Sequence, residues 1–285
     1  MTPVFAGLAR KFWLVAIALV ALTFTAPVFA QSEESWTGIK PDLFGGRAIS
    51  DGADLLAIEA PMRAEDAAVV PITVRALQPQ AGDKAIKAIT LVVDENPAPV
   101  AATISFGPAA ATASFSTRLR VNSYSYIRAI AEMNDGSLRM VKAFVKASGG
   151  CSAPALKDED KSIAEMGQLR LRQFGQDDAE TRDYALAPTD HGAAEAQIMI
   201  RHPNYSGLQM DQLTMLYIPA HFVREIELKR GEDLVFKMEG GISLSENPTF
   251  RFAFRKEGTG ALAVRAEDTQ KNVFAKSWPV ERAGS

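Results

Sequence analysis

Apolar and polar side chains alternate along several short stretches of the chain, which is the period expected of half-buried β-strands. Residues 115–121 show this most clearly, with an apolar set made up of Phe115, Thr117, Leu119 and Val121. The alternate set, which includes Arg118 and Arg120, is then expected to face solvent. Further strands are predicted by apolar or β-branched runs at residues 69–74, 86–93, 126–133 and 138–146. Asp135-Gly136 separates the last two runs and predicts a tight hairpin turn.

The last hundred residues show the same pattern of short strands and turns. Phe250, Phe252 and Phe254 occupy alternate positions of another predicted strand, and glycines at 231, 240, 241, 258 and 260 mark turns around it. Strands spaced roughly 8–12 residues apart, with turns between them, favour antiparallel β-sandwiches. Convincing helical periodicity is absent after the first thirty residues, and only residues 158–166 fit a short helical turn. The predicted fold class is therefore all-β.

A stretch of small residues separates the two blocks of strands. Residues 147–154 read Ala-Ser-Gly-Gly-Cys-Ser-Ala-Pro, and a charged run follows at 157–161. This composition is typical of a linker, and 285 residues leave room for about two domains. We therefore predict a first sandwich at 31–147, a flexible arm and linker carrying the cysteine at 148–164, and a second sandwich at 165–285.

The N-terminal segment has the pattern of a secretory signal peptide. Arg10 and Lys11 precede an apolar run from Phe12 to Phe24, and Val28-Phe29-Ala30 supplies small residues before the expected cleavage site. The run is shorter than the roughly 20 residues that span a bilayer, so an uncleaved anchor is the less favoured alternative. We predict that residues 1–30 are removed and that the mature chain is exported to the periplasm without a membrane anchor.

The overall composition is that of an ordinary globular protein. Hydrophobic residues make up 47% of the chain and charged residues 23%, with 31 Lys and Arg against 34 Asp and Glu. The resulting net charge of −3 argues against a nucleic-acid-binding protein, which normally carries a basic excess.

Cys151, the single cysteine of the chain, lies in the middle of the small-residue stretch. A lone cysteine is most often a small buried apolar residue, but its neighbours here offer nothing apolar to pack against. Linkers are normally exposed, so we predict an exposed thiol. Such a thiol can form an intermolecular disulfide, remain an incidental free thiol, or carry a group covalently. Gly149 and Gly150 would give a carrier arm its flexibility.

Other candidate chemistry is sparse. His191, His202 and His221 lack metal-ligand spacing and are interpreted as structural polar groups. Four methionines offer a soft copper site or simply core packing, namely Met199, Met210, Met215 and Met238. Asn204-Tyr205-Ser206 matches a glycosylation sequon. No hydrolase, phosphate-binding or dinucleotide-binding motif occurs, so the sequence predicts neither an enzyme nor a bound cofactor or metal.

Ordered motifs in both blocks resemble a known pair of proteins. The first block resembles SoxY, the sulfur-carrying subunit of the periplasmic thiosulfate-oxidising system, through residues 60–66, 70–74, 94–99, 117–121, 135–136 and 149–151. The second block resembles its partner SoxZ through residues 200–203, 207, 218–220 and 247–254. The single-chain arrangement is similar to fused SoxYZ-like carriers associated with quinoprotein (PQQ-dependent) alcohol dehydrogenases.

This resemblance implies two immunoglobulin-like sandwiches packed as an intramolecular heterodimer. It also implies that Cys151 is the attachment point for a sulfur intermediate that is presented to partner enzymes. The expected partners are Sox-type enzymes, or a quinoprotein dehydrogenase or its cytochrome c. A dimer linked through Cys151 is a further expectation.

The sequence departs from the SoxY pattern directly after the cysteine. SoxY ends in Gly-Gly-Cys-Gly-Gly, whereas this chain continues through Ser152-Ala153-Pro154 into the second domain. An internal loop enters a partner doubled over and needs a wider cleft than a free end. The alternative function is therefore a binding or adapter module for a quinoprotein dehydrogenase or its cytochrome, in which the cysteine is incidental.

Overall fold

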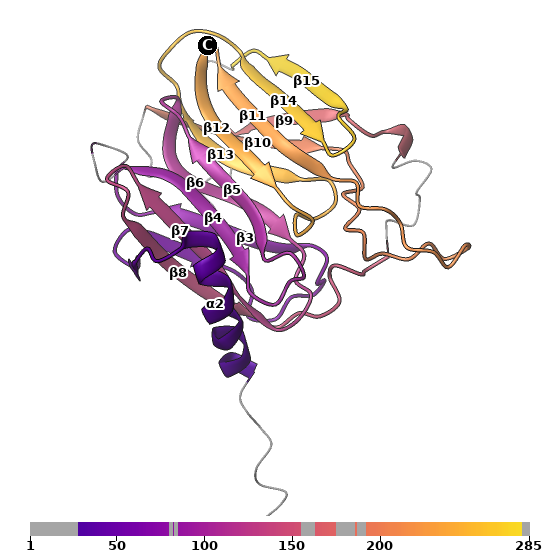
Figure 1. Ribbon diagram of the computed structural model, residues 1–285. Helices are drawn as coiled ribbons and strands as arrows, with labels where there is room; N and C mark the ends of the chain where they lie inside the picture. Colours follow the sequence, from indigo (N-terminus) through magenta and orange to yellow (C-terminus); the bar gives the residue numbers. More distant parts are fainter. Residues whose placement is uncertain are drawn as a thin grey trace, which may run out of the picture.

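The protein is described by a computed structural model, which covers residues 28–79, 82, 85–154, 163–174, 186 and 192–280 (Figure 1). The first half contains the helix α2 (Val28–Phe44) and the strands β1 (Ile49–Asp51), β2 (Leu56–Glu59), β3 (Val70–Ala76), β4 (Ile86–Val93), β5 (Val100–Phe106), β6 (Ala110–Leu119), β7 (Ser125–Met133) and β8 (Leu138–Val145). The second half contains β9 (Leu169–Phe174), β10 (Ala193–Ile200), β11 (Val223–Arg230), β12 (Asp233–Gly240), β13 (Thr249–Arg255), β14 (Leu262–Asp268) and β15 (Val273–Trp278).

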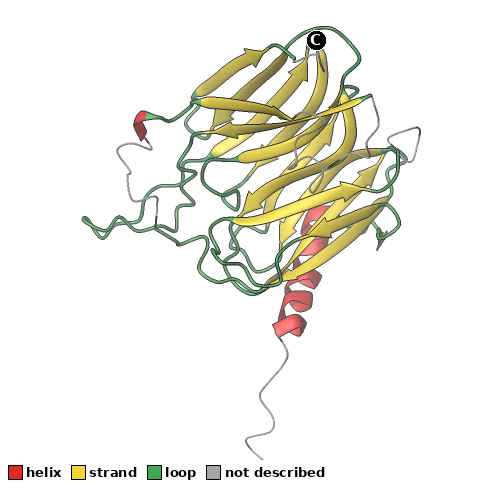
Figure 2. Cartoon of the chain, turned by 180° about the vertical axis from the view of Figure 1, so that it is seen from behind, coloured by secondary structure: helices red, strands yellow, loops and turns green. Residues whose placement is uncertain are grey.

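The strands form a nine-stranded and a six-stranded sheet, and each sheet runs through both halves of the chain (Figures 1 and 2). The larger sheet has the order β1-β8-β7-β4-β5-β12-β11-β14-β15, and the smaller has β2-β3-β6-β13-β10-β9. Pairing is antiparallel except between β1 and β8. The predicted immunoglobulin-like β-sandwich class is confirmed, and the two sandwiches are joined edge to edge in both layers.

Four phenylalanines pack where the two halves join. Phe106 lies opposite Phe236 in the β5–β12 pair, and Phe115 lies opposite Phe252 in the β6–β13 pair. The Phe236 and Phe252 rings are 5.4 Å apart in an edge-on arrangement, which is favourable for aromatic pairs. These side chains belong to a single hydrophobic core that contains strand residues of both halves.

The apolar runs in the sequence located several strands well. The predicted strand at 86–93 matches β4, and those at 126–133 and 138–146 match β7 and β8. The turn between β7 and β8 contains Gly136 at φ 82°, and the Gly136 N–H donates to Met133 O at 2.9 Å. This left-handed backbone conformation explains why glycine follows Asp135 there.

The helix α2 corrects the expectation that helix is missing after the first thirty residues. It begins at Val28, passes the predicted cleavage site and continues to Phe44. Trp36 is 7% exposed and packs with Val92, Ile130 and Leu138. The helix contains 17 residues, but Pro41 lies inside it, and a proline normally kinks or ends a helix, so the helix was not recognised in the sequence.

Buried polar contacts hold α2 against the larger sheet. Ser32 donates to Asp94 at 3.0 Å and accepts from the Tyr126 N–H. Asp94 also receives bonds from Nε and Nη2 of Arg128, whose guanidinium stacks 4.6 Å from the Trp36 ring. The segment that follows the predicted signal peptide is therefore part of the folded domain.

Several sequence predictions concern residues outside the described ranges. The basic and apolar parts of the signal peptide lie there, as do residues 155–162 of the linker and His191. Residues 163 and 164 of the predicted helical turn are helical, and Met166 N–H donates to Ile163 O at 3.1 Å. In the part of the chain that is described, no helix is long and apolar enough to cross a membrane.

Candidate functional site

Cys151 is fully buried, so the prediction of an exposed thiol is wrong. Its side chain is 0% exposed. The loop that follows β8 folds back onto the end of β6, where the Gly149 N–H donates to Asn122 O at 2.8 Å and the Gly150 N–H donates to Val121 O at 3.1 Å. Small residues fit this position because they let the backbone approach its neighbours closely, and linker-like composition did not reveal that.

The two glycines that precede the cysteine have different roles in this packing. A Cβ on Gly150 would lie 2.1 Å from Ala67 O and 2.7 Å from Val121 O, so a side chain is sterically excluded. Gly149 has open space around it but adopts φ +78°, a conformation that side chains disfavour. In this structure both glycines are bound to the sandwich, and their role as a flexible arm stays a prediction.

Residues of the second half cover the cysteine loop from the other side. The Ser206 hydroxyl donates to the Cys151 carbonyl at 2.5 Å, and Gln209 Nε2 donates to the Ala153 carbonyl at 3.0 Å. Gln209 Oε1 in turn accepts from the Ser206 N–H at 3.0 Å. Ser206 and Gln209 thus form a clamp that holds the loop at the carbonyls of Cys151 and Ala153, the two neighbours of Ser152.

Arg120 is the buried charge of this site. Its side chain is 1% exposed and donates to three carbonyls, Leu244 O at 3.4 Å, Gly150 O at 3.3 Å and Asn204 O at 3.1 Å. The strand pattern had placed Arg120 on a solvent-facing side. That side is buried because the second half of the chain packs over the end of β6.

Burial and the charge of Arg120 shift the pKa of the Cys151 thiol in opposite directions. Burial raises the pKa of Cys151, and the positive charge of Arg120 opposes that rise. The first effect is larger, so the thiol is protonated at neutral pH in this closed arrangement. Since the thiolate is the reactive form, a reaction at Cys151 would first require the loop to open.

Family models match both halves of the chain. The model of the sulfur oxidation protein SoxY matches residues 40–151, and that of the sulphur oxidation protein SoxZ matches residues 185–279. The chain therefore contains a SoxY domain followed by a SoxZ domain. The predicted resemblance is thereby confirmed, and the SoxY match ends at Cys151 itself.

Solved structures show partial likenesses to this chain. The sulfur carrier protein SoxY from Chlorobium limicola f thiosulfatophilum is 24% identical with a TM-score of 0.35, over 41% of this chain and 96% of that protein. Superoxide reductase (neelaredoxin) from Ignicoccus hospitalis is 20% identical with a TM-score of 0.29, over 32% and 79% respectively. Among curated proteins, no sequence matches this chain.

The SoxZ domain brings His202, His221 and Asp268 together, which no local spacing had indicated. Each offers a ligand atom within 4.8 Å of the others, and His221 Nε2 lies 2.8 Å from Asp268 Oδ2. The Asn204 N–H donates to His202 Nδ1 at 3.0 Å, so the proton of the neutral ring is on Nε2, the nitrogen 3.5 Å from Asp268. A protonated nitrogen has no lone pair for a metal ion, and we interpret the cluster as structural.

The ionisation of this cluster follows from its burial and its hydrogen bonds. Burial and the neighbouring His221 lower the pKa of His202 to about 4, so His202 is neutral at pH 7. Burial by itself would raise the pKa of Asp268, but hydrogen bonds from Asn272 and His221 outweigh it and lower that pKa to about 2. Asp268 is therefore a charged acceptor in a buried polar network.

The sequon and the methionines do not form the sites considered in the sequence. Asn204 is 0% exposed, with its side chain bonded to Ser245 O and the Val223 N–H, so the folded SoxZ domain leaves no room for a glycan. Met238 is fully buried on β12, whereas Met215 is 65% exposed on a loop. These two methionines do not share one copper site.

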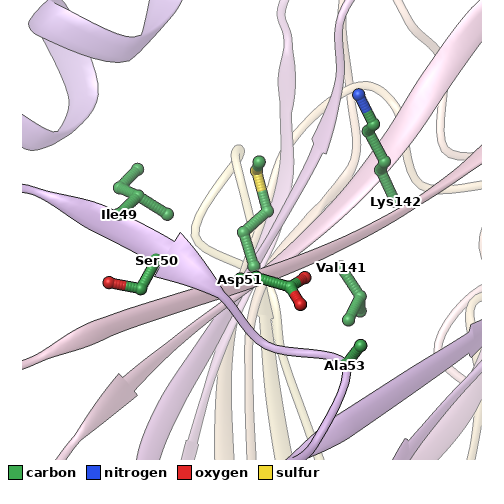
Figure 3. Close-up of a pocket in the computed structure, with 7 residues that line it drawn as sticks. Ile49, Ser50, Asp51, Ala53, Val141 and Lys142 are labelled. Atoms are coloured by element: carbon green, nitrogen blue, oxygen red, sulfur yellow. The ribbon is translucent and has the colours of Figure 1, made fainter.

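A surface pocket of about 400 Å³ lies away from the cysteine, beside β1 and β8 of the SoxY domain (Figure 3). Its lining residues are Ile49, Ser50, Asp51, Ala53, Met140, Val141 and Lys142. Neither Cys151 nor any residue of its clamp lines the pocket. The clamp residues Ser206 and Gln209 and the buried Arg120 are instead the site residues that sequence reasoning missed.

Proposed function

We propose that this protein is a non-enzymatic sulfur carrier of the periplasm, in which Cys151 holds a sulfur intermediate covalently and presents it to partner enzymes. The observation that carries this proposal is the coincidence of the end of the SoxY match with the single cysteine of the chain. The SoxY relative of Chlorobium limicola is itself a sulfur carrier protein. The signal-peptide pattern of residues 1–30 supports the periplasmic location.

The loading chemistry needs no group beyond the thiol and its donor. The Cys151 thiolate attacks one sulfur of a donor's sulfur–sulfur bond, a new sulfur–sulfur bond forms, and the donor's other sulfur leaves as a thiolate. The exchange conserves electrons, so no separate oxidant takes part. Unloading is the same exchange with an acceptor thiolate. Opening of the clamp precedes both steps, because the closed thiol is buried and protonated.

Intact-mass spectrometry of protein isolated natively from its host tests the carrier. We expect adducts that reductant removes and that are missing in Cys151→Ala. Cys151→Ser is the matched isosteric control for folding. A single unmodified mass in the wild-type protein, together with normal growth of the Cys151→Ala strain on reduced sulfur compounds, would refute the carrier function.

The burial of Cys151 favours a second candidate function. In this alternative the two domains form an adapter for a quinoprotein dehydrogenase or its cytochrome c, and the cysteine is a structural residue. Co-purification of such an enzyme in equal yield with wild type and with Cys151→Ser supports the adapter. Loss of the enzyme in the Cys151→Ser preparation supports the carrier instead.

A further inference from the structure

The segment between β10 and β11 of the SoxZ domain contains a hairpin, residues 210–217, that projects away from both sheets (Figures 1 and 2). Met210 pairs with Tyr217, and the Asp211 N–H donates to Leu216 O at 2.9 Å. At its base, the Ile218 N–H donates to Gln209 O at 2.8 Å. The hairpin is thus an extension of the clamp that holds the Cys151 loop.

The tip of this hairpin is exposed and apolar. Leu213 is 94% exposed, Met215 65%, Leu216 69% and Tyr217 66%. Single exposed apolar side chains are common on proteins, but four of them within residues 213–217 indicate an interaction site. Within the described residues, the other large exposed apolar side chains are dispersed along the chain, at Leu43, Met62, Leu77, Tyr124, Ile163 and Val273.

Internal hydrogen bonds fix the shape of the tip. The Asp211 carboxylate accepts from the N–H groups of Leu213 at 3.0 Å and Thr214 at 2.6 Å, and from the Thr214 hydroxyl at 2.8 Å. Met215 follows at φ 58°. An apolar tip that is already ordered loses little conformational freedom on binding, which favours affinity.

The scarcity of charged residues in the hairpin indicates what kind of surface it binds. Between residues 207 and 220, Asp211 is the one residue among Asp, Glu, Lys and Arg, and its carboxylate is bonded within the turn. Recognition therefore rests on apolar contact. Segments that bind membranes at the surface normally combine apolar side chains with Lys or Arg, and this segment has neither. A projecting apolar tip instead fits an apolar cleft on another protein.

Two exposed apolar residues of the SoxY domain lie near the segment that leads into the Cys151 loop. Met62 is 65% exposed, and its carbonyl accepts from the Lys146 N–H at 2.8 Å. Tyr124 is 39% exposed and lies two residues after Asn122, whose carbonyl accepts from the Gly149 N–H. Exposed apolar side chains of both domains thus lie near the cysteine loop.

We infer that the hairpin 210–217 is the docking element for the enzyme that reacts with Cys151, and that its tip enters an apolar cleft of that enzyme. This inference rests on the proposed carrier function. The clamp residues join the hairpin to the loop, so a partner bound to the tip is positioned beside the thiol. The same partner also contacts Met62 and Tyr124, so its interface extends to both domains around the loop.

Two trapping experiments with the full chain in its native host test this inference. A photoreactive benzoylphenylalanine replaces Leu213 in one strain and Leu77, which is 51% exposed, in a control strain. Separately, mixed disulfides of Cys151 are trapped by rapid alkylation and resolved without reductant. We expect one polypeptide, the same by mass spectrometry, to be attached at Leu213 and at Cys151 and to be missing from the Leu77 strain.

Substitution then tests whether docking matters for the thiol chemistry. The double variant Leu213→Ser/Leu216→Ser is expected to lower the yield of the Cys151-linked partner at least fivefold, whereas Leu77→Ser leaves it unchanged. Attachment of Leu213 to a second copy, to lipid, or to a polypeptide that Cys151 never binds would overturn the inference. An unchanged yield in the double variant would overturn it while leaving the carrier intact. The lack of any Cys151 adduct in wild type refutes the carrier itself.

Discussion

Weakening the clamp should expose the thiol of Cys151. The substitution Gln209→Ala removes the bond from Nε2 to the Ala153 carbonyl and also the Oε1 acceptor of the Ser206 N–H. Neither change touches the hydrophobic core. The global fold is therefore expected to persist, while local opening of the cysteine loop becomes more frequent.

The size of the effect follows from the number of bonds lost. One hydrogen bond contributes about 1 kcal/mol net to stability, which corresponds to about a fivefold change in the opening equilibrium. Loss of two bonds would change the opening equilibrium by about 30-fold if their contributions were additive. This is an upper limit, because neighbouring bonds are not strictly additive. The labelling rate of Cys151 should therefore rise between about fivefold and 30-fold in Gln209→Ala.

The assay is the rate of thiol labelling by Ellman's reagent in native buffer, with urea-unfolded protein as the reference. Gln173→Ala is the matched control, because Gln173 also donates through Nε2 to a backbone carbonyl, Pro279 O at 2.9 Å, elsewhere in the SoxZ domain. We expect the control to label at the wild-type rate. If native wild type labels as fast as the unfolded chain, or Gln209→Ala labels no faster than wild type, the clamp model is wrong.

Three further predictions concern stability, each measured by urea unfolding. Gly150→Ala should lose about 3 kcal/mol or more because its Cβ would meet backbone oxygens. Gly149→Ala, with open space but positive φ, should lose only about 1–2 kcal/mol, and equal losses would contradict this. Asp94→Ala should lose about 3–5 kcal/mol by leaving the buried Arg128 poorly paired, and a loss below 1 kcal/mol would contradict that. The pKa of His202 is lowered from 6.5 to about 4 in the folded protein. As pH falls, His202 is therefore protonated in the unfolded chain at a higher pH than in the folded protein. Stability should therefore drop by about 3 kcal/mol between pH 6.5 and 4, and His202→Gln should flatten that decline.

The fold could be predicted from the sequence as far as local pattern determines it. Apolar or β-branched runs located β4, β7 and β8, and alternation of phenylalanines located β13. The resemblance implied that the two sandwiches pack together, but the edge-to-edge pairing of their strands was not predicted, since the pairing of Phe106 with Phe236 and of Phe115 with Phe252 links residues far apart in the sequence. Local pattern carries no information on such pairings.

The site was predicted in part. The cysteine and its glycines were identified from composition, but composition cannot distinguish a mobile linker from a loop that packs tightly through its small side chains. Arg120 was assigned to solvent for a related reason, because the surface that buries it is supplied by the second domain. Ser206 and Gln209 are ordinary polar residues whose part in the site appears only when the two domains are placed together.

The sharing of both sheets has a consequence for how the chain is made. β5 and β6 are the strands through which the first half continues into the second, and their partners β12 and β13 are synthesised much later. Until then β5 and β6 are edge strands, one in each sheet of the first sandwich, and the unpaired edge of such a strand is a template for aggregation. The covalent link keeps the second half at high effective concentration. The link therefore protects the folding chain against wrong strand pairing, independently of any role of its cysteine.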